Sequence, residues 1–316
     1  MLLGAAGVIY AQRRGLPARA AAPILAAFLL QISFYLLPAF PEARARLEQR
    51  FAPARLALLT LAAALAPYLL YSLATGVFHW SSLLLLAGIV AIPAYVFVVA
   101  PTTSRGLAWQ DLAAGGTVAA AILGKLFRTI YISPVEGLRL EVMGQIMITG
   151  VGAIAFLCLR RLDGSGYRLA MSWADWKTGL QQFALFLPVG AATAWVVGFA
   201  AFAPVKADPW TYPWLAAGTF LGMYAVVGLS EEFFFRGILQ NLATASLGSA
   251  VAAQALSSVL FGLSHLPFRG FPNWRLALLA GIAGWFYGQA YRKRNSVVAS
   301  SITHALVAST WRMLFA

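Results

Sequence analysis

The sequence has little charge and, in particular, few acidic residues. Asp, Glu, Lys and Arg together make up only 10% of the 316 residues, whereas about a quarter of an ordinary soluble domain is charged. Hydrophobic residues make up 61%, which is more apolar surface than a water-soluble globule can bury. These proportions exclude a soluble domain, a disordered chain and a nucleic-acid-binding protein, and they are typical of an all-α membrane protein.

Cysteine is almost absent, because Cys158 is the single one in the chain. An internal disulfide and a metal site built from several thiolates are therefore excluded. The 23 Lys and Arg residues outnumber the 10 Asp and Glu residues, which gives a formal net charge of +13. In a membrane protein such a basic excess lies in short loops, where it sets the topology and meets anionic headgroups. Membrane lipid is thus an expected partner, and nucleic acid is not.

The sequence contains many long hydrophobic runs. A helix needs about 20 apolar residues to cross a bilayer. Runs of this kind occupy residues 18–40, 56–74, 80–101, 112–132, 140–159, 183–204, 213–244, 248–268, 274–291 and 296–315. We predict an all-α, polytopic membrane helical bundle of about eight to ten transmembrane helices. The weakest run is 112–132, because it contains Lys125 and Arg128.

The longest polar stretch inside the chain, residues 160–178, divides it into two regions. Its Gly and Ser residues indicate a loop. We predict an N-terminal transmembrane region of unassigned role at 1–165 and a C-terminal transmembrane domain at 166–316.

Two features of the loops predict how the C-terminal region is arranged. Ser172 followed by Asp175 is typical of a helix N-terminus, so an interfacial helix is expected to lead into the run at 183–204. Loops 160–178 and 291–295 are strongly basic and are separated by an even number of spans. Both are therefore predicted on the cytoplasmic side of the cell (inner) membrane.

Three ionisable residues lie inside one apolar run. Glu231, Glu232 and Arg236 occur in the run at 213–244, whereas the other acids lie in loops or near run ends. An ionisable group inside a bilayer costs several kcal/mol unless it is paired or hydrated, so it indicates function. Glu232 and Arg236 share a helix face and can pair. Glu231 is rotated by about 100° and can face a separate cavity as a reactive carboxylate.

Two histidines lie in later runs. His265 and His304, counted from the predicted cytoplasmic ends at about 1.5 Å per residue, can meet Glu231 near the middle of the membrane. Alone, either histidine would more often be a structural hydrogen bond between helices. Together, a carboxylate and two imidazoles suit water activation. They can act directly as general base and polarising groups, or bind a divalent metal such as zinc; the sequence leaves both routes open.

The order of these residues resembles a known family. Glu-Glu-x-x-x-Arg, Phe-x-x-x-His and a later span histidine are similar to the motifs of the CPBP family, also called the Abi or CAAX-protease family, of intramembrane endopeptidases. The matching positions are Glu231, Glu232, Arg236, Phe261, His265 and His304. The resemblance covers about residues 170–316. The family's last motif ends in Asn or Asp, whereas this chain has Ala308 at that position.

The resemblance implies a role for each matching residue. Glu231 would be the catalytic carboxylate, His265 would help it activate water, and His304 would stabilise the oxyanion or bind a metal. Glu232, Arg236 and Phe261 would brace the site. The region 166–316 is thus expected to hydrolyse a peptide bond of a membrane-associated protein or peptide. Because Ala308 offers no hydrogen bond, Ser300 and Ser301 are the candidates for oxyanion support.

Two alternatives stay open on the sequence. The same buried Glu, Arg and His side chains also suit a non-proteolytic transporter, a scaffold or an immunity factor. The segment Gly262-Leu-Ser264-His265 fits the short nucleophile motif of rhomboid serine proteases, in which Ser264 would pair with His304. That rhomboid reading leaves the two glutamates and Arg236 unexplained.

Overall fold

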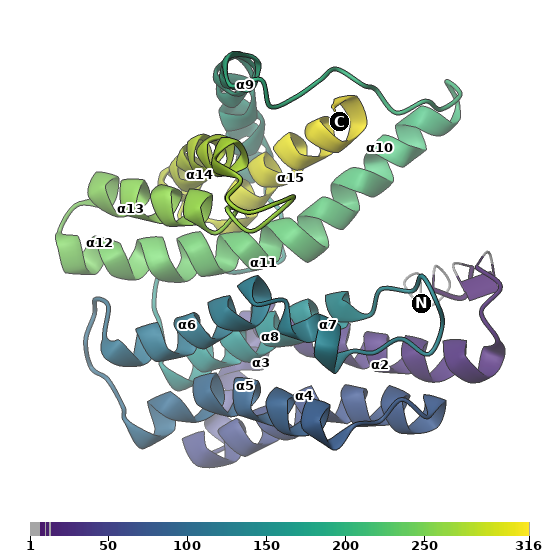
Figure 1. Cartoon of the computed structure of the whole chain (residues 1–316). Coiled ribbons are helices and arrows are strands. Elements are labelled where there is room, and N and C mark those ends of the chain that lie inside the picture. Colours follow the sequence, from purple (N-terminus) through teal and green to yellow (C-terminus); the bar gives the residue numbers. More distant parts are fainter. Residues whose placement is uncertain (1–6, 10, 13, 316) are drawn as a thin grey trace. The chain divides into compact units, whose positions relative to one another are not determined.

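The computed structural model describes residues 7–9, 11, 12 and 14–315. All regular elements of the described residues are helices, apart from an isolated bridge between Phe202 and Phe315, and this confirms the all-α prediction. It forms two compact units, which are described separately here (Figure 1). The first unit comprises residues 1–103 and 108–162, and the second comprises 104–107 and 163–316.

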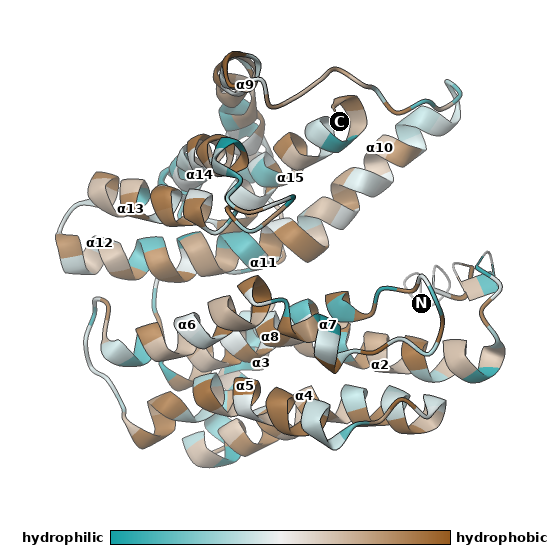
Figure 2. Ribbon diagram, viewed as in Figure 1, coloured by the Kyte–Doolittle hydropathy of each residue, from teal (hydrophilic) through white to brown (hydrophobic). Residues whose placement is uncertain are grey.

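Among the described residues, six helices are long and apolar enough to cross a membrane. They are Ala18–Ala39, Pro53–Thr75, Trp80–Val99, Glu141–Leu159, Trp173–Val196 and Thr211–Leu247. Figure 2 shows hydrophobic residues along these helices. The protein is therefore a helical membrane bundle. The apolar helix α13 (Ala250–Leu263) and the helices α14 (Trp274–Arg294) and α15 (Val297–Leu314) complete the second unit.

The first unit is built around a central helix. Its elements in order are α2 (Ala18–Leu36), η1 (Leu37–Ala39), α3 (Pro41–Arg50), α4 (Pro53–Thr75), α5 (Trp80–Val99), α6 (Trp109–Leu123), α7 (Leu126–Ile130), α8 (Glu141–Ile154) and η2 (Ala155–Leu159). Helix α8 is the most enclosed, because α2, α4, α5, α6 and α7 all pack against it. Every residue from Ile146 to Ile154 is buried. These residues include two glycines and a threonine, which allow neighbouring helices to come close.

The predicted run 112–132 is not one span. Helix α6 ends at Leu123, and Lys125 then adopts a left-handed conformation with φ of 55°. The short helix α7 begins at Leu126. A left-handed residue cannot continue a right-handed helix, so the chain turns at this point. The prediction of a single helix over 112–132 is therefore wrong.

The second unit contains α9 (Trp173–Val196), one long helix, and the hairpin-like series α13, α14 and α15. The long helix Thr211–Leu247 is made of α10 (Thr211–Gly222), η3 (Met223–Gly228), α11 (Leu229–Glu232), η4 (Phe233–Gln240) and α12 (Asn241–Leu247). Helix α14 packs against α9, α13 and α15, and α15 also packs against α9, η3 and α11. The core of this unit therefore lies around α14 and α15.

Helix α9 begins as the sequence predicts. The Ser172 hydroxyl accepts a hydrogen bond from the Asp175 amide at 3.1 Å, and the Asp175 carboxylate accepts one from the Ser172 amide at 2.9 Å. This reciprocal cap satisfies two backbone donors that the helix itself cannot use. The helix then continues unbroken to Val196. The expected separation between an interfacial helix and a span starting at 183 is therefore wrong.

The two basic loops of the second unit lie at the same end of it. The Val297 amide donates to the Gly166 carbonyl at 3.1 Å, and the Tyr291 hydroxyl donates to the Gly164 carbonyl at 2.9 Å. At the opposite end, the Ala203 amide donates to the Leu314 carbonyl at 2.9 Å. Residues 164–166 and 291–297 therefore lie together, as a shared side requires, and the cytoplasmic location of the two loops stays a prediction.

Candidate active site

The Glu232 carboxylate and the Arg236 guanidinium form a buried ion pair. The Oε2 atom of Glu232 lies 3.2 Å from Nε of Arg236, and both side chains are fully buried. Another nitrogen of Arg236, Nη2, donates to the carbonyl of Gly284 on α14 at 2.8 Å. The pair that the spacing of four residues predicts is therefore present, and it ties the long helix to α14.

Helix α15 supplies two further partners to the same carboxylate. The Nδ1 atom of His304 lies 2.8 Å from Oε1 of Glu232, and the Ser300 hydroxyl donates to Oε2. Ser300 and His304 are four residues apart, so they project from one face of α15. Glu232 is thus surrounded by an arginine, an imidazole and a hydroxyl, which are the partners that a buried carboxylate anion requires.

Glu231 has a different environment from its neighbour. About a third of its side chain is exposed, at 36%, whereas the Glu232 side chain is fully buried. Its Oε2 atom is enclosed and has no hydrogen-bond partner among the described residues. This atom lies 3.9 Å from Nε2 of His304, which is too long for a direct hydrogen bond. Glu231 is therefore the carboxylate of the pair whose Oε2 atom has no fixed partner among the described residues.

The imidazole of His304 lies between the two glutamates. Because the Glu232 carboxylate only accepts, Nδ1 of His304 must carry a proton, and Nε2 is left facing Glu231. The ring stacks on Tyr287, with the centroids 4.7 Å apart and the planes at 15°. The carboxylate and the stacking ring together fix both the tautomer and the orientation of this histidine.

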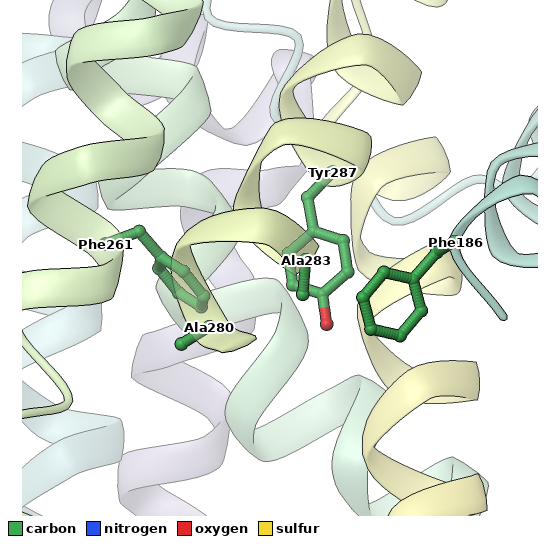
Figure 3. Packing of buried hydrophobic residues seen from close by; sticks show 5 residues of the cluster. All are labelled: Phe186, Phe261, Ala280, Ala283 and Tyr287. Carbon is green, nitrogen blue, oxygen red and sulfur yellow. The ribbon is translucent and has the colours of Figure 1, made fainter. Parts of the chain in front are cut away.

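The phenyl ring of Phe261 brings the two histidines to one place. It lies 4.7 Å from the ring of His265 and 5.8 Å from the ring of His304, between centroids. The guanidinium of Arg236 lies 4.7 Å from the same phenyl centroid, in a cation–π contact. Phe261 is 2% exposed, and Figure 3 shows it packed with Tyr287 and the small residues of α14.

The imidazole of His265 is oriented by its own helix. Its Nδ1 atom lies 2.8 Å from the carbonyl oxygen of Phe261, four residues earlier. Because a carbonyl only accepts, Nδ1 carries the proton and Nε2 keeps its lone pair. His265 is only partly buried. The Phe-x-x-x-His spacing thus fixes the histidine twice, through the phenyl ring and through the backbone carbonyl.

The two glutamates lie on a single α-helical turn between two segments of wider, π-helical geometry. Helix α11 spans only Leu229–Glu232, and the segments Met223–Gly228 and Phe233–Gln240 on either side have π-helical geometry. Widened turns of this kind occur frequently at functional sites, because they change which side chains face the bundle. At Gly228 the helix approaches α15 closely, and a Cβ there would lie 3.2 Å from the Ser301 carbonyl oxygen.

Residues 213–310 match the family described as Type II CAAX prenyl endopeptidase Rce1-like. The resemblance to the CAAX proteases is confirmed over this segment. The matched part of the chain extends from α10 into α15, and it contains the two glutamates, Arg236, Phe261 and both histidines of the site. Comparison with curated proteins and with solved structures gave no significant match.

Small residues allow the helices of the CAAX-protease-like segment to pack closely. A Cβ atom at Gly262 of α13 would lie 2.6 Å from the Ala277 carbonyl oxygen, so the first turn of α14 would have to shift away. A Cβ atom at Gly284 would lie 3.1 Å from Nη2 of Arg236. The absence of a side chain at Gly284 lets Arg236 reach the backbone of α14.

Two buried glutamines continue this attachment toward the end of α14. Nε2 of Gln240 donates to the Gly288 carbonyl at 3.2 Å, and Nε2 of Gln254 donates to the Trp285 carbonyl at 3.0 Å. Apolar contacts between helices gain little over contacts with lipid, so hydrogen bonds and close packing hold such a bundle together. In the CAAX-protease-like segment these bonds fix α14 against its neighbours.

The two serines expected to support an oxyanion have different surroundings. The Ser300 hydroxyl has a single proton, which is directed to Glu232, and its oxygen also lies 2.9 Å from the Tyr287 carbonyl. Its proton is therefore already engaged, and oxyanion support by Ser300 stays a prediction. Ser301 is fully buried beside Gly228, and its hydroxyl has no partner among the described residues; oxyanion support by Ser301 stays a prediction.

The serine–histidine dyad of the rhomboid alternative is not formed. The Ser264 hydroxyl donates to the Phe261 carbonyl at 2.7 Å and lies 3.3 Å from Nδ1 of its neighbour His265. His304, the partner that the alternative requires, is bound to Glu232 instead. The arrangement therefore does not favour a serine nucleophile.

A three-ligand metal site is not formed by the described residues. No group of three His, Cys, Asp or Glu side chains in this part of the chain is arranged to hold a metal ion. The metal set expected from the sequence was Glu231, His265 and His304. Nδ1 of His304 is already bound to Glu232, and Nδ1 of His265 faces a backbone carbonyl. These contacts leave Nε2 of both imidazoles open, as it is in many metal-binding histidines, so metal binding by Glu231, His265 and His304 stays a prediction.

Sequence reasoning missed two features of the site. It assigned Glu232 to Arg236 alone, whereas the carboxylate also binds Ser300 and His304. The spacing of four between Ser300 and His304 was a signal for a shared face. Nothing in the sequence indicated Tyr287, which is one of two tyrosines in the apolar run 274–291 and stacks on His304.

Proposed function

We propose that the second unit is an intramembrane endopeptidase that hydrolyses a peptide bond of a membrane-associated protein or peptide. The family-level similarity to CAAX endopeptidases supports this reaction class. The observation that carries the proposal is the unpaired Oε2 atom of Glu231, 3.9 Å from an imidazole nitrogen that is held in place by a second carboxylate. A gap of that length is suited to a bridging water.

In the proposed first step, Glu231 accepts a proton from water as general base. The lone pair on Nε2 of His265 helps to orient that water. The water oxygen then bonds to the carbonyl carbon of the substrate, and the electrons of the carbonyl double bond move onto its oxygen. The tetrahedral intermediate that results carries one negative charge, on the former carbonyl oxygen.

In the second step, the bond between carbon and nitrogen breaks as the oxyanion re-forms a carbonyl. Glu231 returns its proton to the departing amine, which completes the balance of atoms and charge. With a proton also on Nε2, the imidazole of His304 can donate a hydrogen bond to the oxyanion.

The location and the substrate class belong to the same proposal. The membrane would be the cell (inner) membrane, with loops 160–178 and 291–295 on the cytoplasmic side, because both are basic and lie at one end of the unit. The matched family acts on prenylated CAAX peptides by its printed description. A farnesylated peptide ending in Cys-aliphatic-aliphatic-X is therefore the first probe for this chain.

The experiment is cleavage of that peptide, carrying a quenched fluorophore, by the full chain in detergent and in liposomes. Glu231→Gln keeps the size of the side chain and removes the base, so we expect turnover to fall by about 1,000-fold or more. His265→Ala is expected to lower turnover by about 100-fold or more.

Ser264→Ala serves as the control, since only the rhomboid mechanism needs its hydroxyl. We expect this variant to retain turnover within about 10-fold of the unaltered chain. Undiminished turnover in both Glu231→Gln and His265→Ala, or loss of all turnover in Ser264→Ala, would contradict the proposal.

A further inference from the structure

The active site lacks a side chain where the related proteases have a hydrogen-bond donor. The polar residue that the family places four positions after His304 is Ala308 in this chain. The oxyanion would then have only His304 as a donor. Loss of one oxyanion donor costs about 100- to 1,000-fold in kcat in other hydrolases. A second donor is therefore expected from another part of the structure.

The position of Tyr287 along α15 follows from two contacts. Its backbone carbonyl oxygen lies 2.9 Å from the Ser300 hydroxyl, and its ring stacks on the His304 imidazole at 4.7 Å. Ser300, His304 and Ala308 are spaced four residues apart, so each lies about 6 Å further along the helix than the last. Along the axis of α15, the backbone carbonyl of Tyr287 therefore lies beside Ser300, and its ring lies beside His304. Its hydroxyl therefore points along α15 toward the turn of Ala308.

The packing around Tyr287 gives the same direction independently. Figure 3 shows the ring between Phe261 and Phe186, with the hydroxyl on the side of Ala283. Ala283 is one turn earlier on α14 and belongs to the same buried cluster as Tyr287. Val307, the neighbour of Ala308, packs against that cluster. The cluster around Tyr287 thus reaches the turn of α15 that contains Ala308.

Among the described residues, the hydroxyl of Tyr287 makes no hydrogen bond that stabilises the fold. The residue is 3% exposed, and the structure gives its hydroxyl no hydrogen bond to any described residue. By contrast, Tyr291, one turn later on the same helix, donates its hydroxyl to the Gly164 carbonyl at 2.9 Å. A donor without a partner beside a catalytic imidazole is suited to a charge that appears only during the reaction.

We propose that the Tyr287 hydroxyl donates a hydrogen bond to the oxyanion of the tetrahedral intermediate, in place of the polar side chain missing at position 308. This inference rests on the proposed endopeptidase function and names a further catalytic residue for it. Stacking on His304 and packing against Phe186 and Phe261 hold the ring in one orientation. The donor is therefore fixed before charge develops, which is what makes such a group effective.

Tyr287→Phe tests the role of the hydroxyl and retains the ring. In cleavage of the farnesylated peptide, we expect kcat to fall by about 100-fold while KM changes by less than about 3-fold, because the hydrogen bond forms only in the transition state. The matched control is Tyr291→Phe on the same helix. It removes a hydroxyl that binds Gly164, so we expect a lower midpoint of thermal unfolding and an unchanged kcat.

Ala308→Asn supplies the donor that the related proteases have. In the Tyr287→Phe background we expect it to raise kcat by at least 10-fold, which a purely structural role of Tyr287 would not allow. In the unaltered chain, where Tyr287 already donates, the same substitution should change kcat by less than about 3-fold. A gain above 10-fold in the unaltered chain would overturn the inference, whether or not Tyr287→Phe folds.

The outcomes separate this inference from the function on which it rests. If Glu231→Gln abolishes cleavage but Tyr287→Phe keeps kcat within 3-fold, the role of Tyr287 is wrong and the endopeptidase proposal stands. If the unaltered chain shows no cleavage that depends on Glu231, both are wrong.

Discussion

Glu232 and His304 are 72 residues apart in the sequence and 2.8 Å apart in the structure, between Oε1 and Nδ1. The same carboxylate forms the ion pair with Arg236. One buried side chain therefore both neutralises an arginine inside the membrane and orients the imidazole that faces Glu231. Substitutions of Glu232 can separate these two roles, because an isosteric amide keeps the shape of the side chain and removes its charge.

Glu232→Gln is the substitution that retains shape and removes charge. We expect kcat for peptide cleavage to fall by about 10- to 100-fold, because an amide does not hold the histidine in the required tautomer and charge state. We also expect the free energy of unfolding to fall by about 3–5 kcal/mol, because Arg236 is left buried without its counter-ion. Thermal unfolding in detergent and peptide cleavage measure the two effects.

Glu141→Gln is the matched control for that variant. Glu141 lies 3.8 Å from Arg139 and 3.9 Å from Arg128, and both of these arginine side chains are more than half exposed. Exposed pairs contribute little to stability, about 0–1 kcal/mol, so stability and turnover should both stay close to those of the unaltered chain. Equal losses in the two variants would show that Glu232 has no special role.

Gly284→Ala tests the close approach of Arg236 to α14. The added methyl group would lie 3.1 Å from Nη2 of Arg236 and 3.1 Å from Cδ1 of Phe261. Since both neighbours are fully packed, we expect a loss of stability of about 1–3 kcal/mol and a lower turnover, because Phe261 contacts both histidines. The measurement is again the unfolding midpoint together with peptide cleavage.

Gly218→Ala on the long helix is the comparison for this substitution. A Cβ atom at Gly218 meets no atom within 4 Å, so alanine there should be neutral or stabilise the helix by up to about 1 kcal/mol. If Gly284→Ala behaves in the same way, the arginine can be accommodated elsewhere and the close packing is not required.

A second buried ion pair lies in the first unit and allows that unit to be tested by itself. Nη2 of Arg160 lies 2.9 Å from Oδ2 of Asp111, and the two side chains are 5% and 1% exposed. Asp111→Ala removes the carboxylate counter-ion of the buried Arg160, so we expect a loss of about 3–5 kcal/mol in the unfolding free energy. The adjacent pair of Arg161 and Glu48 is longer, at 3.9 Å, and more exposed.

Glu48→Ala therefore serves as the control in the first unit, with an expected change of about 0–1 kcal/mol. A small effect of Asp111→Ala, comparable to that of Glu48→Ala, would mean that water reaches the buried pair. Peptide cleavage by each variant, measured below its unfolding temperature, shows whether the first unit contributes to the activity at all.

Contacts within one helix could be predicted from the sequence, and contacts between helices could not. The pairing of Glu232 with Arg236 and the cap formed by Ser172 and Asp175 depend only on helix geometry, which is the same in every helix. The attachment of Glu232 to His304 depends on how two helices are rotated about their axes. That rotation is set by packing along their whole length, including close approaches at glycines such as Gly228 and Gly284.

The hydrophobic runs predicted where most helices lie but not where they break. Apolar composition continues across residues 112–132, yet the left-handed backbone at Lys125 divides this run into two helices. In the opposite sense, polar residues at 173–178 do not prevent α9 from continuing to Val196. Hydropathy averages over about a turn or more, whereas a single backbone conformation is enough to end a helix.

The widened turn at Met223–Gly228 has a consequence for how a substrate reaches Glu231. Each such turn takes up more residues than a regular one, so the side of the helix that faces the protein changes across it. None of the residues from Thr211 to Gly222 is buried, whereas Glu232, Phe233 and Arg236 beyond the turn are. Under the proposed function, a peptide anchored in the bilayer by a lipid chain could therefore move along the exposed residues of α10 and reach Glu231 while its anchor stays in the hydrocarbon.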